Sequence, residues 1–188
     1  MYFFLVQWVV LLGGLALHVG LDRSPDRRTR RRVAELVLLW FVVANGVFMV
    51  LGGIVHIGPG STGAAAQIGF APSAFQWEVG VYDLAMGIAG IACARRALRG
   101  GFTDATVVIT ALALLGDGIG HIMQLAAHGN DAVNNVGAIP TCFVVPVVTL
   151  TALVVLRRLP ASASADADTD TDGPGDTGSR HRRPAVSA

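Results

Sequence analysis

The chain has 188 residues, of which 53% are hydrophobic and 14% charged, with a formal net charge of +1. This composition is unlike that of a soluble domain, and no nucleic-acid partner is expected. No Asp, Glu, Lys or Arg occurs between Glu35 and Glu78, or between Asp131 and Arg157, and runs of that length suit helices that cross a bilayer.

Five apolar segments predict an all-α polytopic membrane bundle. They cover about residues 2–21, 33–57, 75–94, 105–128 and 138–156. The first segment has no basic region before it and no small-residue cleavage site after it, so it is predicted to be a retained helix rather than a signal peptide. Residues 1–158 therefore form one predicted transmembrane domain.

The predicted helix boundaries follow from capping and breaker residues. Residues 58–74 are rich in Gly and Pro and are predicted to form a loop with at most one interfacial turn. Ser73 followed by Gln76 has the spacing of a capping box and predicts the start of the third span. Thr103 or Asp104 is predicted to cap the fourth.

Arginine placement predicts the orientation. The segments after the first, third and fifth spans hold six, three and two Arg, whereas those after the second and fourth hold none. The positive-inside rule then places the N-terminus outside and the C-terminus in the cytoplasm of a multi-pass plasma-membrane protein. The Arg run is a topology signal first, although it could also bind anionic lipid. Residues 159–188 have no apolar period and are predicted to be a disordered cytoplasmic tail.

Polar side chains recur on one face of the fourth span. Asp117, His121, Gln124 and His128 follow one another at spacings of four, three and four, and Gly116 and Gly120 lie beside them. Ionisable groups near mid-membrane are costly, so this face should meet protein or water rather than lipid.

The third span carries a matching stripe. Gln76, Gly80, Asp83 and Gly87 follow at heptad spacing, and Glu78 lies close to the same end of the span. Two such small and polar faces could pack together and bring Asp83 near Asp117 or His121. Two carboxylates in close contact cannot both stay ionised, so one would be protonated or would share a proton with the imidazole.

The predicted polar cluster lies in the outer half of the bundle. Its members are Asp83, Asp117, His121, Glu78, Gln76 and Gln124, with His56 at the outer end of the second span. Asn45, in the middle of that span, is predicted to make a cross-helix hydrogen bond, and Glu35 to pair with the adjacent arginines.

Three interpretations of the cluster stay open. It could bind or move a proton or a small ligand; it could be interhelical glue in a structural or assembly subunit that docks a membrane protein or a second copy; or it could belong to a redox protein with haem or quinone. His56, His121 and His128 are weak metal-ligand candidates, because no two of them share the i, i+4 spacing on one helix. No cofactor is expected, no catalytic residue can be named, and an enzyme is less expected than a binding or structural protein.

Two motifs carry a resemblance. Gly69-Phe-Ala-Pro-Ser-Ala-Phe-Gln-Trp-Glu-Val-Gly80 and Gly120-His-Ile-Met-Gln-Leu-Ala-Ala-His-Gly-Asn130 resemble an uncharacterised family of small bacterial integral membrane proteins, a domain of unknown function, over about residues 1–158. That resemblance implies the membrane architecture and no assigned activity. The Gly-rich third span is also faintly similar to DoxX-like membrane proteins, which would imply a redox association.

Overall fold

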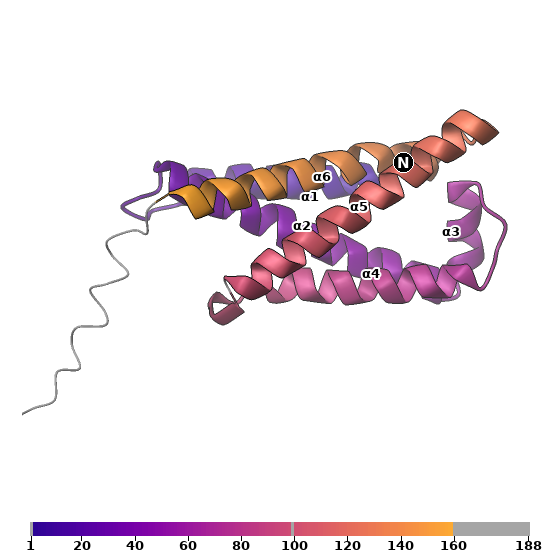
Figure 1. Cartoon of the computed structure of the whole chain (residues 1–188), viewed down its shortest axis with the longest axis horizontal. Helices are drawn as coiled ribbons and strands as arrows, with labels where there is room; N and C mark the ends of the chain where they lie inside the picture. Colours follow the sequence, from indigo (N-terminus) through magenta and orange to yellow (C-terminus); the bar gives the residue numbers. More distant parts are fainter. Residues whose placement is uncertain (1, 99, 160–188) are drawn as a thin grey trace, which may run out of the picture. The chain divides into compact units, whose positions relative to one another are not determined.

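The computed structural model describes residues 2–98 and 100–159 and is helical throughout this part of the chain (Figure 1). Its elements are α1 (Tyr2–Leu21), α2 (Arg30–Ile57), α3 (Ser61–Ile68), α4 (Phe75–Ala92), the short 3-10 helix η1 (Arg96–Leu98), α5 (Gly101–His128) and α6 (Val133–Arg158). Met1–Arg158 form one compact unit. Apart from Leu159, the predicted tail lies outside the described residues.

Four of the helices, α1, α2, α5 and α6, are long and apolar enough to cross a membrane. The prediction of an all-helical membrane protein is therefore confirmed for these four spans. The remaining predicted span corresponds to α4, which has 18 residues and is more polar because it includes Gln76, Glu78 and Asp83.

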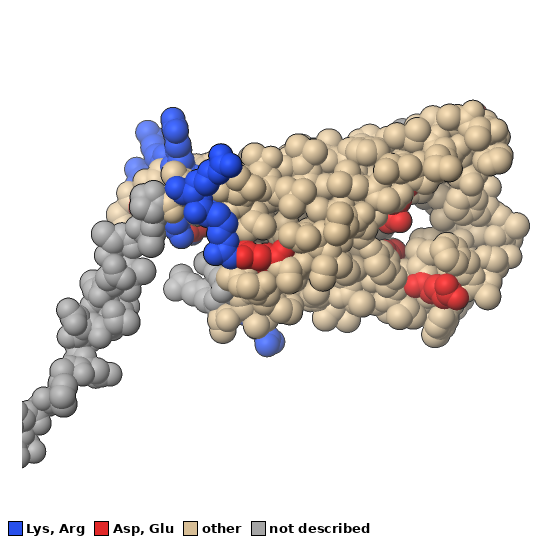
Figure 2. Space-filling view, in the orientation of Figure 1, with Lys and Arg blue, Asp and Glu red and all other residues tan. Residues whose placement is uncertain are grey.

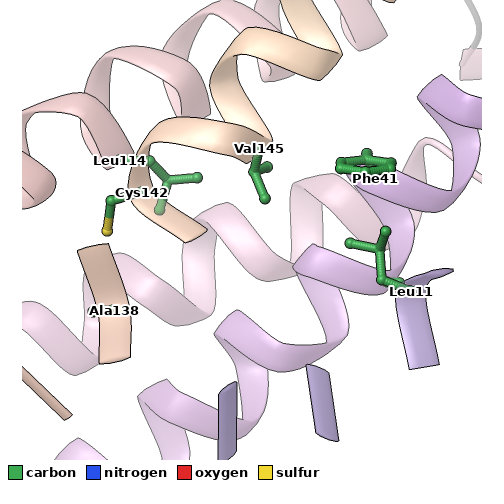
Figure 3. Packing of buried hydrophobic residues seen from close by; sticks show 7 residues of the cluster. Leu11, Phe41, Leu114, Ala138, Cys142 and Val145 are labelled. Atoms are coloured by element: carbon green, nitrogen blue, oxygen red, sulfur yellow. The ribbon is translucent and has the colours of Figure 1, made fainter. Parts of the chain in front are cut away.

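Helix α2 is the centre of the bundle and contacts α1, α3, α4 and α6, most extensively α4. One core cluster joins α1, α2, α5 and α6 through Leu11, Phe41, Leu114, Cys142 and Val145 (Figure 3). Hydrogen bonds add to this packing. Trp8 Nε1 donates to Thr141 Oγ1 at 3.1 Å, and Gln7 Nε2 donates to Asn45 Oδ1 at 3.0 Å, which confirms the cross-helix bond predicted for Asn45.

The small-residue stripe of α4 packs on α2, whereas the sequence predicted that it would pack on α5. A Cβ atom added to Gly46 would lie 2.8 Å from the Gly87 carbonyl oxygen, and one added to Gly53 would lie 2.7 Å from the Gly80 carbonyl oxygen. Because glycine lets helix backbones approach closely, these two pairs fix the α2–α4 contact. Helices α4 and α5 make far fewer contacts, and α5 pairs with α6 instead.

The third predicted span begins where α4 begins, at Phe75, but its predicted cap and the predicted starts of the fourth and fifth spans were wrong. Ala74 precedes α4 and makes no side-chain capping bond, since Gln76 turns into the bundle instead. Helix α5 begins at Gly101, and the Thr103 hydroxyl donates to the Leu98 carbonyl at 3.0 Å. Helix α6 begins at Val133, about five residues early, because Asn135 finds polar partners inside the bundle.

The predicted loop at residues 58–74 contains α3, an eight-residue helix. Its end is set by Gly69, whose φ of 78° is in the left-handed region that favours glycine. The amide of Phe70 then donates to the Ala65 carbonyl at 2.9 Å, and Ala65 is fully buried. Helix α3 lies at the end of the bundle where α4 begins and α5 ends (Figure 1), and we call this the α3 end.

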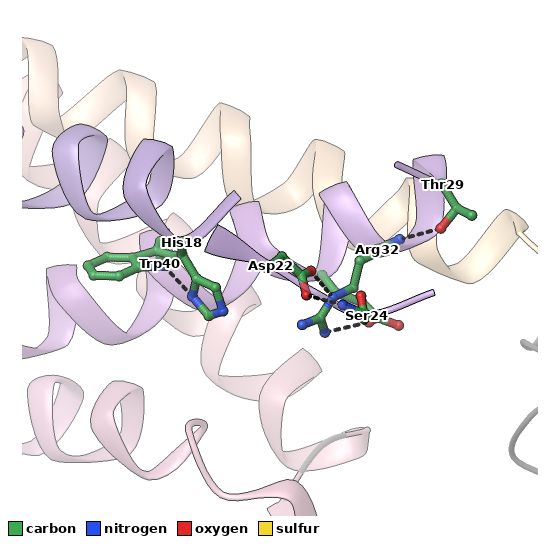
Figure 4. A network of polar contacts seen from close by, with 7 residues as sticks. His18, Asp22, Ser24, Thr29, Arg32 and Trp40 are labelled. Carbon is green, nitrogen blue, oxygen red and sulfur yellow. Dashed lines mark hydrogen bonds and ion pairs between the residues drawn. The ribbon is translucent and has the colours of Figure 1, made fainter. Parts of the chain in front are cut away.

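Arginines gather at the opposite end of the bundle (Figure 2), which we call the arginine end. The loop between α1 and α2 is tied there by Arg32, whose Nε donates to Asp22 Oδ2 at 2.7 Å (Figure 4). Arg32 and the backbone N–H of Ser24 hold the pKa of the Asp22 carboxyl well below its usual range. Glu35 pairs with Arg31 at 3.2 Å and with Arg32 at 3.7 Å, which confirms its predicted role.

Candidate functional site

The six residues of the predicted cluster come from two helices. Helix α4 carries Gln76, Glu78 and Asp83 in its first half, and α5 carries Asp117, His121 and Gln124 in its second half. Since α4 begins where α5 ends, both sets lie toward the α3 end (Figure 1). The contacts of each side chain then divide the six residues into those that bond to another helix and those that do not.

Two carboxylates of the predicted cluster lie on neighbouring helices, Asp83 on α4 and Asp117 on α5. They are close enough to interact electrostatically, although the two helices touch little. Asp83 is half-buried against α2, where a Cβ on Gly52 would lie 3.6 Å from its Oδ2 atom, whereas Asp117 is exposed. Figure 2 shows acidic side chains at the edge of a hollow toward the α3 end. We call the space between Asp83 and Asp117 the acidic cleft.

Neither carboxylate of the acidic cleft is satisfied by a partner. Within residues 2–98 and 100–159, no donor forms a hydrogen bond or ion pair with Asp83 or Asp117. The nearest compensating group is His121, one helical turn from Asp117, with which it interacts electrostatically.

Gln76 and His56 do connect helices. Gln76 is 8% exposed, and its Oε1 is in hydrogen-bond contact with Nδ1 of His56, which joins α4 to α2. This contact uses Gln76, a member of the predicted polar cluster, and His56, a candidate metal ligand. It also accounts for the failed capping box, because the amide that should have capped α4 is used inside the bundle.

His121 is held by Asn135, a residue that the sequence analysis did not single out. The His121 Nδ1 lies 2.8 Å from the Asn135 Oδ1, and the Asn135 Nδ2 donates to the carbonyls of Asn130 at 2.7 Å and of His121 at 3.3 Å. Asn135 is fully buried. Since every polar atom of its amide is used, Asn135 joins the end of α5 to the start of α6.

The same amide-rich segment fixes α3. Asn130 Nδ2 donates to the Ile68 carbonyl at 2.9 Å, and Asn134 Nδ2 donates to Gln67 Oε1 at 2.8 Å. A signal for this network is present in the sequence, because Asn130, Asn134 and Asn135 follow His128 within seven residues. The stretch lies between the predicted spans 105–128 and 138–156, and asparagine is common in such connections, so the sequence alone does not distinguish the network from an ordinary loop.

The other predicted residues lie at the surface. Glu78 and His128 are exposed, and Gln124 is half-exposed. Among the described residues, no group of three or more His, Cys, Asp or Glu could hold a metal ion, so His56, His121 and His128 do not come together. The candidate site is therefore the pair Asp83 and Asp117, with His121 one helical turn from Asp117.

Comparison with known proteins identifies a family to which the chain is similar, but no individual protein. The family described as "Family of unknown function (DUF6790)" matches residues 1–162. A search of curated proteins and a search of solved structures each gave no significant match, and the similarity to DoxX-like proteins is not shown. The match covers all six α-helices and both motifs that carried the resemblance. The chain therefore belongs to the DUF6790 family, a family of unknown function.

Proposed function

We propose that this protein is a five-span plasma-membrane protein whose acidic cleft takes up a proton or a small cationic ligand from the outer side. The observation that carries the proposal is the pair of carboxylates, Asp83 and Asp117, which interact with each other and have no hydrogen-bond donor among the described residues. Ionisable groups kept unpaired within a membrane bundle are costly, and such groups commonly mark proton or substrate paths.

The proposed orientation rests on the arginine end. The described arginines that follow α1 and α4, and the two that end α6, lie in the segments that the positive-inside rule assigns to the cytoplasm. The α3 end and the acidic cleft then face outward. Helix α4 crosses as the remaining span, since Asp83 is turned toward the cleft and Gln76 toward His56, away from lipid.

The chemistry follows from charge repulsion. Two carboxylates that face each other in surroundings of low dielectric constant repel, and binding of one proton or one cation between them relieves the repulsion. His121 can assist, because its Nδ1 donates to Asn135 Oδ1 in the tautomer that leaves Nε2 able to accept a proton. We propose Glu78 and Gln124 as the polar mouth of the cleft, while Gln76 is engaged inside the bundle by His56.

Infrared spectroscopy of the purified protein tests the proposal. The carbonyl band of a protonated carboxyl group is followed between about pH 4 and pH 9, the range in which perturbed carboxyl groups titrate. We expect Asp83→Asn and Asp117→Asn each to remove a titrating band at unchanged protein yield. The matched control is Asp131→Asn, which changes an exposed carboxylate outside the cleft. The cleft is structural if the two cleft variants keep the wild-type titration. It is also structural if these variants fail to accumulate although Asp131→Asn accumulates normally.

A second candidate function, docking of a partner helix, is favoured by one observation. A Cβ added to Gly116 or Gly120 would meet nothing within 4 Å, so the α5 face that carries Asp117 has room for another helix. In that case Gly120→Leu should abolish a crosslinked complex that the wild type forms in membranes. Gly118 is not suitable for this test, since its Cβ would lie 2.8 Å from Cys142 Cβ within the bundle.

A further inference from the structure

A second pocket lies at the arginine end, between α2, α5 and α6. Its volume is about 240 Å³, close to the roughly 300 Å³ at which small-molecule sites begin. The pocket is separate from the acidic cleft and contains none of its residues.

The lining of this pocket is divided by polarity. Guanidinium and carboxylate groups from Arg31, Arg32, Glu35, Asp104 and Arg157 contribute its polar part. Aliphatic side chains contribute the rest, among them Leu36, Leu38, Leu39, Val42, Leu153 and Leu156. A ligand that fits both parts must be amphipathic.

The charged residues favour an anionic group. Three arginines line the pocket against two carboxylates, and a third carboxylate, that of Asp22, binds Arg32 from outside the lining. The carboxylates are engaged, Glu35 with Arg31 and Arg32 on the same helix, and Asp104 in an ion pair with Arg157 that joins α5 to α6. A guanidinium has five N–H donors in a planar fork, more than one carboxylate oxygen can accept, and the fork matches the oxygens of a phosphate. Arg157 is also accessible, with 59% of its side chain exposed.

We propose that this pocket binds one anionic phospholipid, with its phosphate at Arg32 and Arg157 and part of one acyl chain against Leu153 and Leu156. The pocket extends from the helix ends, at Arg31 and Arg157, to about three turns inside α2 at Val42, a depth over which headgroups give way to acyl chains around a membrane-spanning bundle. Basic pockets between membrane helices are a known setting for anionic headgroups. The proposal rests on the lining of this pocket and on the membrane-spanning helices around it, and it is independent of the acidic cleft.

The test is thermal unfolding of the delipidated, full-length protein in detergent, with short-chain phosphatidylglycerol or phosphatidylcholine added. We expect phosphatidylglycerol to raise the Tm by about 3 to 6 °C at about ten times its dissociation constant, and phosphatidylcholine by less than about 1 °C. Native mass spectrometry should show one retained phosphatidylglycerol per chain.

Three variants locate the effect. Leu153→Trp fills the apolar part of the pocket, and Arg157→Gln removes a guanidinium that is largely exposed, so folding should tolerate it. Arg158→Gln is the matched control, since this adjacent arginine does not line the pocket. Loss of the Tm rise in either pocket variant, with the control unchanged, supports the site.

Three results would overturn the proposal. The first is an equal Tm rise with both phospholipids. The second is a full rise in both pocket variants. The third is a rise with the free fatty acid decanoate and none with phosphatidylglycerol, which would assign the pocket to a fatty acid.

Discussion

Substitution of Gly87 by alanine tests the contact on which the fold depends. A Cβ at this position would lie 2.6 Å from the Gly46 carbonyl oxygen and 2.8 Å from the Val50 amide nitrogen. Both atoms belong to the backbone of α2, so no side-chain rotation can make room and the helices must move apart. Overpacking of this kind costs about 1–3 kcal/mol. Alanine also gains up to about 1 kcal/mol in helix propensity over glycine, which partly offsets the clash.

The matched substitution Gly116→Ala separates these two effects. It gives the same gain in propensity on α5, where the added Cβ meets nothing within 4 Å. The difference between the two variants therefore measures the clash alone. For a chain of this length, about 1–3 kcal/mol corresponds to a Tm difference of roughly 2–12 °C, with Gly87→Ala the less stable.

Thermal unfolding of the purified variants in detergent provides the measurement, with wild type and both variants at equal protein and detergent concentrations. Gly87→Ala should unfold below wild type, and Gly116→Ala at or slightly above it. Equal Tm values for the two alanine variants would refute the close α2–α4 contact, and with it the assignment of the α4 stripe to α2.

Three further perturbations have defined outcomes. Because the pKa of Asp22 is lowered by Arg32, their contact stabilises the fold above the ordinary carboxyl pKa of about 4 and is lost as the pH falls below it; the Tm difference between wild type and Asp22→Asn should shrink over that range. Asn135→Leu leaves buried polar groups around His121 without a partner, so it should cost about 1–3 kcal/mol by thermal unfolding. Replacing Gln7 or Asn45 alone by leucine should destabilise the fold, and replacing both should cost less than the sum, which a double-mutant cycle measures.

The positions of the long helices could be predicted from the sequence because a run without charged residues can be recognised in each segment by itself, without knowing which segments pack together. The predicted first span, residues 2–21, has the same bounds as α1. Helix α3 was missed because its eight residues lie between glycines and prolines that indicate a loop. The predicted cap of α4 and the predicted start of α6 failed for another reason: the Gln76 and Asn135 amides form bonds to other helices, and such bonds outweigh local capping preferences.

Which helices pack together was harder to predict. Small residues occur along α2, α4 and α5. A stripe of small residues identifies the face of a helix that can approach a neighbour closely, but it does not identify the neighbouring helix. One usable signal was overlooked, since Gly46 and Gly53 are seven residues apart and so are Gly80 and Gly87. Two glycine pairs with the same seven-residue spacing, one on α2 and one on α4, suit an extended close contact between these helices. Gly116 and Gly120 on α5 are four residues apart and match neither pair.

The choice of α2 as the partner of α4 explains why the acidic cleft exists. A helix has one face for its closest neighbour, and the glycine face of α4 is occupied by α2. Helix α5 is drawn to α6 through Gly118, which lies against Cys142, so it cannot close on α4 along its whole length. Asp83 on α4 and Asp117 on α5 are therefore left without a direct hydrogen bond or ion pair among the described residues. The sequence allowed these two carboxylates to share a close helix–helix contact; the glycine contacts place α4 against α2, and α5 packs against α6 instead.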